Sequence, residues 1–256
     1  MQRFLPWVVL LASAMASGGA HAQSLLDACH ATSSYDVTIS DNGVTFDRAQ
    51  PEPRRVHLND GRLGINGKPV NLDAEDSDRV TLIERTVRTL EPKVKAIADR
   101  GVDLAAQAVR EQAAASASGE SGELDARLAS VSADLKARIA ASHSSHDWHG
   151  PAFQQYANQT VARIVPLLAS GLLQQAVTAA LSGDLDAAAQ LRQRATHMAT
   201  ALRTRIRQKL QVLRPQVQAL CPSLRRMDQL ESGIHTPLPG GVHINLIDVG
   251  KRQTRS

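Results

Sequence analysis

The sequence predicts an α+β protein that is mostly α, with a small N-terminal antiparallel β-hairpin or meander unit followed by long packed amphipathic helices. Over residues 35–72, apolar and polar residues alternate and Gly-containing turns separate the runs, which is typical of short strands. Over much of 73–231, apolar residues recur at spacings of three and four, which indicates helices with one apolar face. Aromatic residues make up only 3% of the chain, so the helices offer few rings for stacking on an aromatic ligand.

The first 22 residues have the pattern of a secretory signal peptide. Arg3 supplies a positive charge, an apolar run extends from Phe4 to about Met15, and Ala20-His21-Ala22 matches the A-x-A cleavage pattern. The apolar run is too short to span a bilayer comfortably. We therefore expect this segment to be removed and the mature protein to reside in the periplasm.

Residues 23–72 are expected to form the N-terminal β unit. Alternating runs flank turns at 41–43 (Asp-Asn-Gly), 59–61 (Asn-Asp-Gly) and 66–67 (Asn-Gly). Asn, Asp and Gly accept the positive φ values that tight hairpin turns require. The segment is therefore predicted to hold two hairpins, or a meander of four to five short strands, with a proline-marked connection at 50–55.

Residues 73–231 are expected to be helical. Asp73 is placed to cap the first helix, and the run DAEDSD that begins there lacks the Gly and the terminal Glu of a calcium loop. Pro92 must either kink this helix or mark its restart after Leu90. Further along, the stretch ASHSSHDWHGPAF at 141–153 separates two apolar helical patterns, so it is predicted to be a turn between helices.

The C-terminal tail, residues 232–256, has no amphipathic period. Its apolar stretch VHINLIDV could add one edge strand, and the rest of the tail is expected to be loose.

Two cysteines, Cys29 and Cys221, lie near opposite ends of the mature chain. An even count in an exported protein favours one disulfide, and neither cysteine belongs to a C-x-x-C redox motif. Two alternatives remain open: a reactive or metal-binding thiol, and a lipid anchor on Cys29, which Asp27 disfavours because it fits a lipobox poorly. The sequence thus predicts a Cys29–Cys221 bridge.

The turn at 141–153 holds three histidines, His143, His146 and His149, at a spacing of three. Histidine is the commonest metal-ligating side chain, so these residues are candidate zinc or copper ligands, with Asp147 as a fourth ligand or as an orienting group. The spacing matches no established metal motif, and Ser144, Ser145 and Gly150 favour a solvated turn instead. No other cofactor is expected.

The last long helix is strongly basic, because nine Lys or Arg residues and no acid lie between Ala187 and Met227. Within it, four arginines fall within about 60° of one another on a helical wheel: Arg192, Arg203, Arg207 and Arg214. Such a stripe could contact an anionic membrane surface or an acidic partner. The alternative is that these side chains cover their own apolar stripe and pair with acids of neighbouring helices such as Glu84, Glu91 and Asp99.

Catalytic motifs are lacking in the sequence. It holds no G-x-S-x-G elbow, no P-loop and no G-x-G-x-x-G after a strand. Nucleic acid is not an expected partner of an exported protein. The lack of these motifs makes an enzyme less expected. A hydrolase whose site the residue spacing does not reveal stays a second alternative.

The layout resembles the YggN-like family of bacterial secreted proteins, a domain of unknown function. The resemblance rests on a Cys near the mature N-terminus, the strand YDVTIS, the strand–turn–strand RLGINGKPVNL leading into a long helix, and a late Cys after Ala-rich helices. It covers about residues 24–230 and implies a periplasmic protein with no assigned functional residues. The sequence therefore predicts a non-enzymatic envelope protein that binds a partner or has a structural role, with metal binding at the histidine turn as the alternative.

Overall fold

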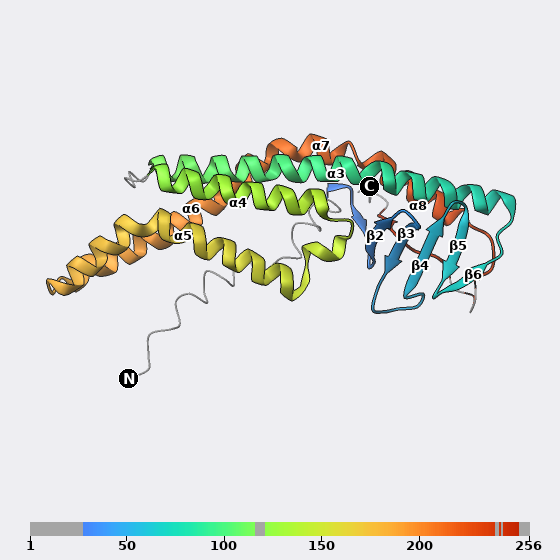
Figure 1. Ribbon diagram of the computed structural model, residues 1–256, viewed down its shortest axis with the longest axis horizontal. Coiled ribbons are helices and arrows are strands. Elements are labelled where there is room, and N and C mark those ends of the chain that lie inside the picture. Colours follow the sequence, from blue (N-terminus) through green and yellow to red (C-terminus); the bar gives the residue numbers. More distant parts are fainter. Residues whose placement is uncertain (1–27, 116–120, 239–240, 242, 251–256) are drawn as a thin grey trace, which may run out of the picture. The chain divides into compact units, whose positions relative to one another are not determined.

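The computed structural model describes residues 28–115, 121–238, 241 and 243–250 (Figure 1), and the predicted signal peptide lies outside them. The fold is α+β and mostly helical, which confirms the prediction. The described residues divide into two compact units whose segments are interleaved along the chain. Among the described residues, the first unit draws on 28–96, 142–154 and 215–250, and the second on 97–141 and 155–214.

The first unit contains a five-stranded antiparallel meander in which each strand pairs with the next along the chain. Its strands are β2 (Asp36–Ser40), β3 (Gly43–Asp47), β4 (Arg55–Asn59), β5 (Arg62–Ile65) and β6 (Lys68–Val70). The predicted meander is therefore confirmed.

The hairpin turns have the backbone conformation that their residues predict. Asp60 and Gly61 join β4 to β5 with φ values of 48° and 76°, and Asn66 and Gly67 join β5 to β6 with φ values of 49° and 79°. Gly61 also lies against the first long helix, because a Cβ placed there would come within 2.6 Å of Ser77 Oγ.

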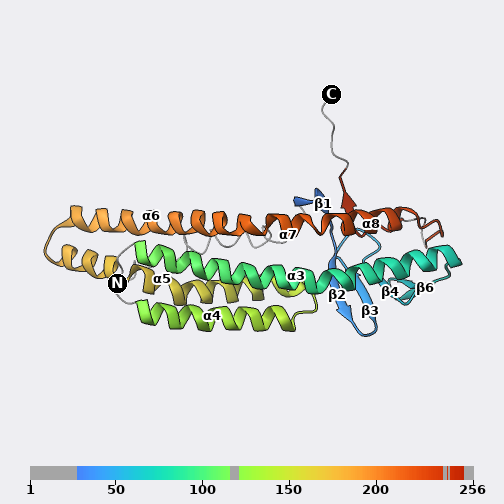
Figure 2. The ribbon, with the colours of Figure 1, turned by 90° about the horizontal axis from the view of Figure 1, so that it is seen from above.

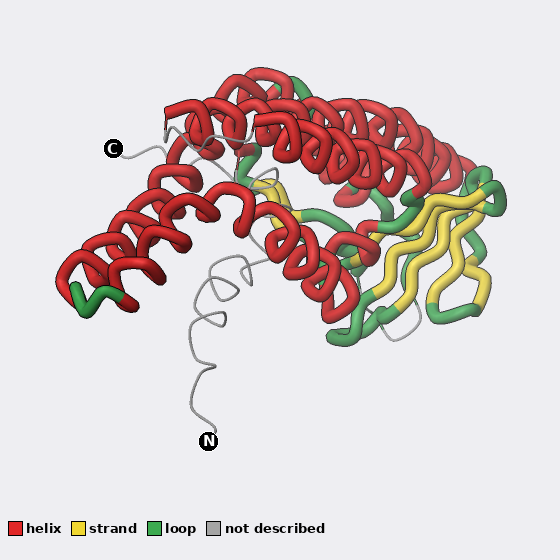
Figure 3. Tube along the Cα trace, turned by 60° about the vertical axis from the view of Figure 1, so that its left-hand side comes forward, coloured by secondary structure: helices red, strands yellow, loops and turns green. Residues whose placement is uncertain are grey.

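Helix α3 (Ala74–Ala115) begins directly after the sheet and runs along it, as Figures 1 and 3 show. Asp73 caps it as predicted, since its Oδ1 accepts a hydrogen bond from the backbone N–H of Asp76 at 2.8 Å. The helix continues through Pro92 without a break, so neither an end at Leu90 nor a restart is observed.

Alternate residues of the sheet point into the core of the first unit. The inward side chains of the sheet, all at most 6% exposed, are Val44, Phe46, Val56, Leu58, Leu63 and Ile65. They pack with Val80, Ile83 and Val87 of α3 and with Met227 of α8 (Cys221–Ser232), which runs beside the start of α3 in Figure 2. The outward residues of the same strands remain available for a site.

The C-terminal segment is packed rather than loose over its described residues. Its buried side chains are Ile234, Leu238, Ile244, Leu246 and Ile247. Strand β7 (Asp248–Val249) pairs with β1 (Ala31–Thr32) in a separate two-stranded sheet. The segment is held because the carboxyl groups of two buried acids, Asp76 and Glu231, accept hydrogen bonds from its backbone. The disulfide Cys29–Cys221 is present as predicted.

The second unit is helical. Besides the later part of α3, it contains α4 (Ser121–Ala141), most of α5 (Gly150–Leu181), α6 (Leu185–Leu210) and the short turn η2 (Gln211–Leu213). The short helix α7 (Arg214–Gln218) follows η2. A small core of this unit contains Val109, Leu124 and Leu128, with Ile164 and Leu202 packed against it. Among the helices of the described residues, none combines the length and apolarity that crossing a bilayer requires.

Candidate metal centre

The histidine turn lies on the edge of the sheet, against β2. The backbone N–H of Ile39 donates to the carbonyl of His143 at 2.8 Å, and the N–H of Val37 donates to Ser145 Oγ at 2.9 Å. The hydroxyls of Thr38 and Ser144 are 2.9 Å apart. An edge strand leaves backbone groups unpaired, and here the turn supplies partners for them. The turn is therefore bound to the sheet rather than only solvated.

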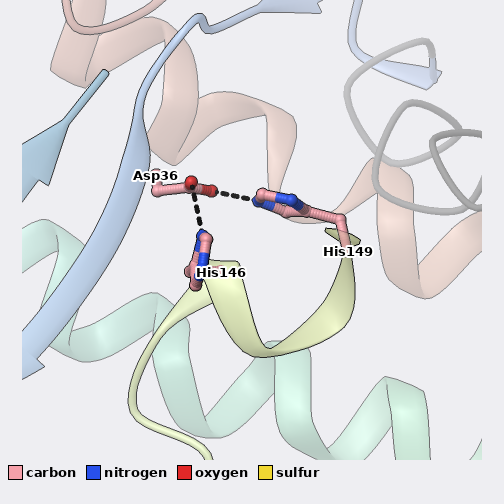
Figure 4. A group of neighbouring side chains, drawn as sticks. All are labelled: Asp36, His146 and His149. Carbon is pink, nitrogen blue, oxygen red and sulfur yellow. Dashed lines mark hydrogen bonds and ion pairs between the residues drawn. The ribbon is translucent and has the colours of Figure 1, made fainter. Parts of the chain in front are cut away.

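Asp36, the first residue of β2, faces two of the three histidines (Figure 4). Its Oδ1 lies 2.6 Å from His149 Nε2, and its Oδ2 lies 3.3 Å from His146 Nδ1. The two imidazole rings are 5.0 Å apart between centroids and nearly perpendicular. One ligand atom from each of these three residues lies within 4.8 Å of the others. Two imidazole nitrogens and one carboxylate oxygen are a donor set that zinc and copper accept.

Local backbone geometry explains why His146 and His149 converge. Residues Ser145–Trp148 form a single 3-10 turn, η1, which His149 terminates. A 3-10 helix has three residues per turn, so side chains three apart lie above one another. His146 lies within this turn and His149 follows it with an extended backbone, and both imidazoles reach Asp36 of β2.

Trp148 anchors this turn from its other side. Its indole Nε1 donates to Ser142 Oγ at 2.9 Å, and its ring makes an edge contact with Phe153 at 5.9 Å between centroids. The Ser142 hydroxyl in turn donates to Asp147 Oδ2 at 3.0 Å. Asp147 is therefore engaged within the turn and does not join the group around Asp36.

The environment of Asp36 keeps its carboxyl ionised. Burial raises its pKa, but hydrogen bonds from His149, Ser145 and His146 outweigh burial and hold the pKa below its ordinary value. The Ser145 hydroxyl donates to Oδ1 at 2.8 Å. A carboxylate that is already charged and oriented is suited to bind a cation.

His143 does not reach this group. Its Nδ1 lies 3.5 Å from a carboxylate oxygen of Glu91 on α3, and its side chain is exposed. Sequence spacing therefore identified two of the three converging residues and missed Asp36, which lies 110 positions before His146. Nothing in the sequence near Asp36 indicates this contact, because it depends on how the turn meets the sheet.

The basic stripe of Arg192, Arg203 and Arg207 on α6 and Arg214 at the start of α7 is only partly described. Arg203 is half-buried and Arg207 and Arg214 are exposed, whereas the side chain of Arg192 lies outside the described residues. No ion pair joins these three described arginines to a described carboxylate. On α6, Lys209 pairs with Glu111 of α3 at 2.6 Å.

The sequence suggested Glu84, Glu91 and Asp99 as partners of these arginines. Two of these acids pair with residues of α3 instead. Glu84 pairs with Arg88 at 2.9 Å and Glu91 pairs with Lys95 at 2.8 Å, both within α3.

Comparison with known proteins identifies a family but no function. The model of a family described as "Protein of unknown function (DUF2884)" matches residues 29–247. Neither the comparison with curated proteins nor that with solved structures finds a match. The YggN-like resemblance seen in the sequence is consistent with the family model. The chain therefore belongs to the DUF2884 family of proteins of unknown function.

Proposed function

We propose that this is an exported, periplasmic protein that binds a divalent zinc or copper ion through Asp36, His146 and His149. One observation carries the proposal: ligand atoms from two segments more than 100 residues apart lie within 4.8 Å of one another. The signal-peptide pattern and the Cys29–Cys221 disulfide support export, because disulfides persist in oxidising compartments.

The three ligand residues, Asp36, His146 and His149, favour a metal site that is partly open to solvent. Three protein ligands leave one tetrahedral position for water or for a further ligand. Both histidines are exposed, at 72% and 44% of their side-chain surface, so an ion can enter from solvent without unfolding the turn. The open position would also admit the water of a metal-dependent hydrolase, so we rank metal binding ahead of hydrolysis only because the sequence holds no hydrolase motif.

Isothermal titration of the metal-free mature protein with zinc and copper tests the proposal. We expect one site with a Kd below about 1 μM, which corresponds to about 8 kcal/mol. Asp36→Ala, His146→Ala and His149→Ala should each weaken it at least tenfold. His143→Ala is the matched control, because it removes a histidine of the same turn that lies outside the group. An affinity weaker than micromolar, or one that these three substitutions leave unchanged, would refute the proposal.

Fluorescence gives a second readout, because Trp148 is the only tryptophan outside the predicted signal peptide. Its contacts place it in the same turn as the two histidines. Bound copper should therefore quench its emission in the wild type and in His143→Ala but not in His149→Ala. Circular dichroism of each variant checks that the fold is retained.

A second candidate function is contact with an anionic membrane surface through α6 and the start of α7. It is supported by Arg207 and Arg214, which are exposed and have no described carboxylate partner. Co-sedimentation with vesicles that contain an anionic lipid tests it at low and high salt. We expect binding at low salt that an Arg203→Glu/Arg207→Glu variant loses. Absence of binding at low salt, or equal binding by the variant, would contradict it.

A further inference from the structure

The histidine turn occupies the edge of the sheet where a further strand would pair with β2. Residues 143–145 run antiparallel to β2, and Ser144 forms an antiparallel bridge with Thr38. The backbone N–H groups of Val37 and Ile39 donate to this segment at 2.9 Å and 2.8 Å. An uncovered edge strand presents such groups to a strand of another chain. The turn therefore covers an edge that would otherwise be open to pairing.

Few contacts hold this cover in place. None of the residues from 142 to 150 is buried, and η1 contains no buried side chain. The hydrogen bonds that Ser145 makes with β2 lie at exposed positions. Trp148 packs against Phe153, which belongs to the same segment rather than to the sheet. Segments with few buried apolar contacts open locally at a low cost in free energy. We therefore expect the turn to leave the edge of β2 readily unless a further link holds it.

The three candidate metal ligands lie on opposite sides of this contact (Figure 4). Asp36 belongs to β2, whereas His146 and His149 belong to the turn. When the turn leaves the edge, the carboxylate and the two imidazoles separate, so the three-ligand site exists only while the edge is covered. A ligand that binds only one of two states shifts the equilibrium between them by the factor 1 + [L]/Kd. A free ion concentration of about 100 times Kd should therefore reduce the uncovered population about a hundredfold.

Ser145 joins the covered edge directly to the metal centre. Its Oγ accepts a hydrogen bond from the N–H of Val37 at 2.9 Å and donates one to Asp36 Oδ1 at 2.8 Å. The same Oδ1 lies 2.6 Å from His149 Nε2. One hydroxyl of the turn thus holds both an edge amide and a ligand carboxylate. A group that hydrogen-bonds a metal ligand fixes the orientation of that ligand, and its loss lowers metal affinity by about ten- to a hundredfold.

We propose that the ion bound by Asp36, His146 and His149 is a structural clip that fastens the histidine turn over the edge of the sheet. This inference rests on the metal binding proposed above and adds the role of the ion. One ligand comes from the edge strand and two come from the turn that covers it, as a link between the two requires. The ion then controls how often the β2 edge is open to another strand, and Ser145 positions the carboxylate that binds the ion.

Hydrogen exchange of single amides, measured by NMR on the mature protein with and without zinc, tests the clip. Calorimetry on the same sample first gives Kd, and the free zinc concentration is then set to about 100 times that value, at which exchange of the Val37 and Ile39 amides should slow about a hundredfold. The amide of Val70 is the internal control, because β6 is the other edge of the sheet and pairs with β5. Local opening of β6 does not separate the ligands, so exchange of the Val70 amide should not change.

Three variants separate the clip from general stabilisation by zinc. Asp36→Ala removes one ligand, so zinc at the same concentration should leave exchange of the Val37 and Ile39 amides unchanged. Ser145→Ala keeps all three ligands but removes the acceptor of the Val37 amide. With zinc at saturation, this variant should still protect the Ile39 amide, whose acceptor is a backbone carbonyl, but not the Val37 amide. Ser145→Thr keeps the hydroxyl and should restore protection of the Val37 amide.

Calorimetry and exchange together distinguish failure of the clip from failure of metal binding. If zinc does not bind the wild type, the proposed function fails and the clip fails with it. If zinc binds but exchange of the Val37 and Ile39 amides is unchanged, the clip is overturned while metal binding stands. Equal slowing of the Val70 amide, or slowing of the Val37 and Ile39 amides in Asp36→Ala, would overturn the clip as well, because the effect of zinc would then not depend on linking the turn to β2.

Discussion

The carboxylate of Asp76 in the first turn of α3 binds Thr236 twice, although the two residues are 160 positions apart. Asp76 Oδ2 accepts from the backbone N–H of Thr236 at 2.8 Å and from its hydroxyl at 2.6 Å. The N–H of His235 adds a third donor at 3.1 Å, and Arg79 pairs with the other oxygen at 2.9 Å. The start of the long helix and the C-terminal segment are thus joined by one fully buried acid.

Asp76→Asn should destabilise the first unit by about 2–4 kcal/mol, because it removes a buried charge that has an ionic partner and several donors. Thr236→Val keeps the backbone donor and removes only the hydroxyl, so it should cost about 1–2 kcal/mol. Urea unfolding followed by circular dichroism measures both values. Equal urea midpoints for the wild type and Asp76→Asn would contradict the stabilising role given to the Asp76 carboxylate.

Glu231 should make stability depend on pH in the opposite sense to an ordinary acid. Burial raises its pKa from 4.5 to about 8, although hydrogen bonds from the backbone N–H groups of Leu246 and Ile247 lower it. The unfolded chain then releases this proton first, so stability declines as pH rises from about 4.5 to about 8.

The loss attributable to Glu231 is at most roughly 3–5 kcal/mol. Glu231→Gln does not ionise and should abolish this decline while leaving stability at pH 4.5 within about 1 kcal/mol of the wild type. Thermal unfolding of both proteins at intervals between pH 4.5 and 9 provides the measurement. Parallel curves for the two proteins across this range would exclude the role given to Glu231.

Loss of the disulfide should destabilise the protein by about 3–5 kcal/mol, because the bond closes a loop of 192 residues. The comparison is between wild type and a Cys29→Ser/Cys221→Ser variant in urea unfolding. Mass spectrometry of the non-reduced wild type should detect no free thiol. Two free thiols, or identical unfolding midpoints, would be inconsistent with the bond.

Gly61 and Gly67 form a matched pair, because both have positive φ, at 76° and 79°. Alanine at Gly67 would meet nothing within 4 Å, so Gly67→Ala should cost only the backbone strain, about 1 kcal/mol. Alanine at Gly61 would also clash with Ser77, at 2.6 Å from its Oγ. Gly61→Ala should therefore lower the melting temperature further than Gly67→Ala; an equal or smaller decrease would show that α3 does not approach this turn closely.

Features with a local cause were predictable from the sequence. The turn at Asn66-Gly67 and the cap at Asp73 depend on residues within four positions of one another, and both are observed. His146 and His149 are close in the sequence and lie within and directly after one 3-10 turn, so their proximity is local in the same sense.

The contacts that complete the sites are long-range and leave no pattern in the sequence. Asp36 meets the histidine turn only because that turn binds the edge of β2. The C-terminal segment seemed loose because its apolar residues have no period, yet an irregular backbone can bury side chains one at a time. Buried acids such as Asp76 then satisfy the backbone groups that regular structure would otherwise pair.

The interleaving of the first unit has a consequence for the order of events during synthesis. Cys29 leaves the ribosome 192 residues before its partner Cys221, and β1 precedes β7 by a similar interval. The sheet and the start of α3 are therefore synthesised before α8 and the C-terminal segment, whose side chains pack in the same core. Until Cys221 and the C-terminal segment are made, Cys29 lacks the partner that it has in the folded protein, and the apolar face of the sheet lacks the side chains of α8 and of that segment that pack in its core.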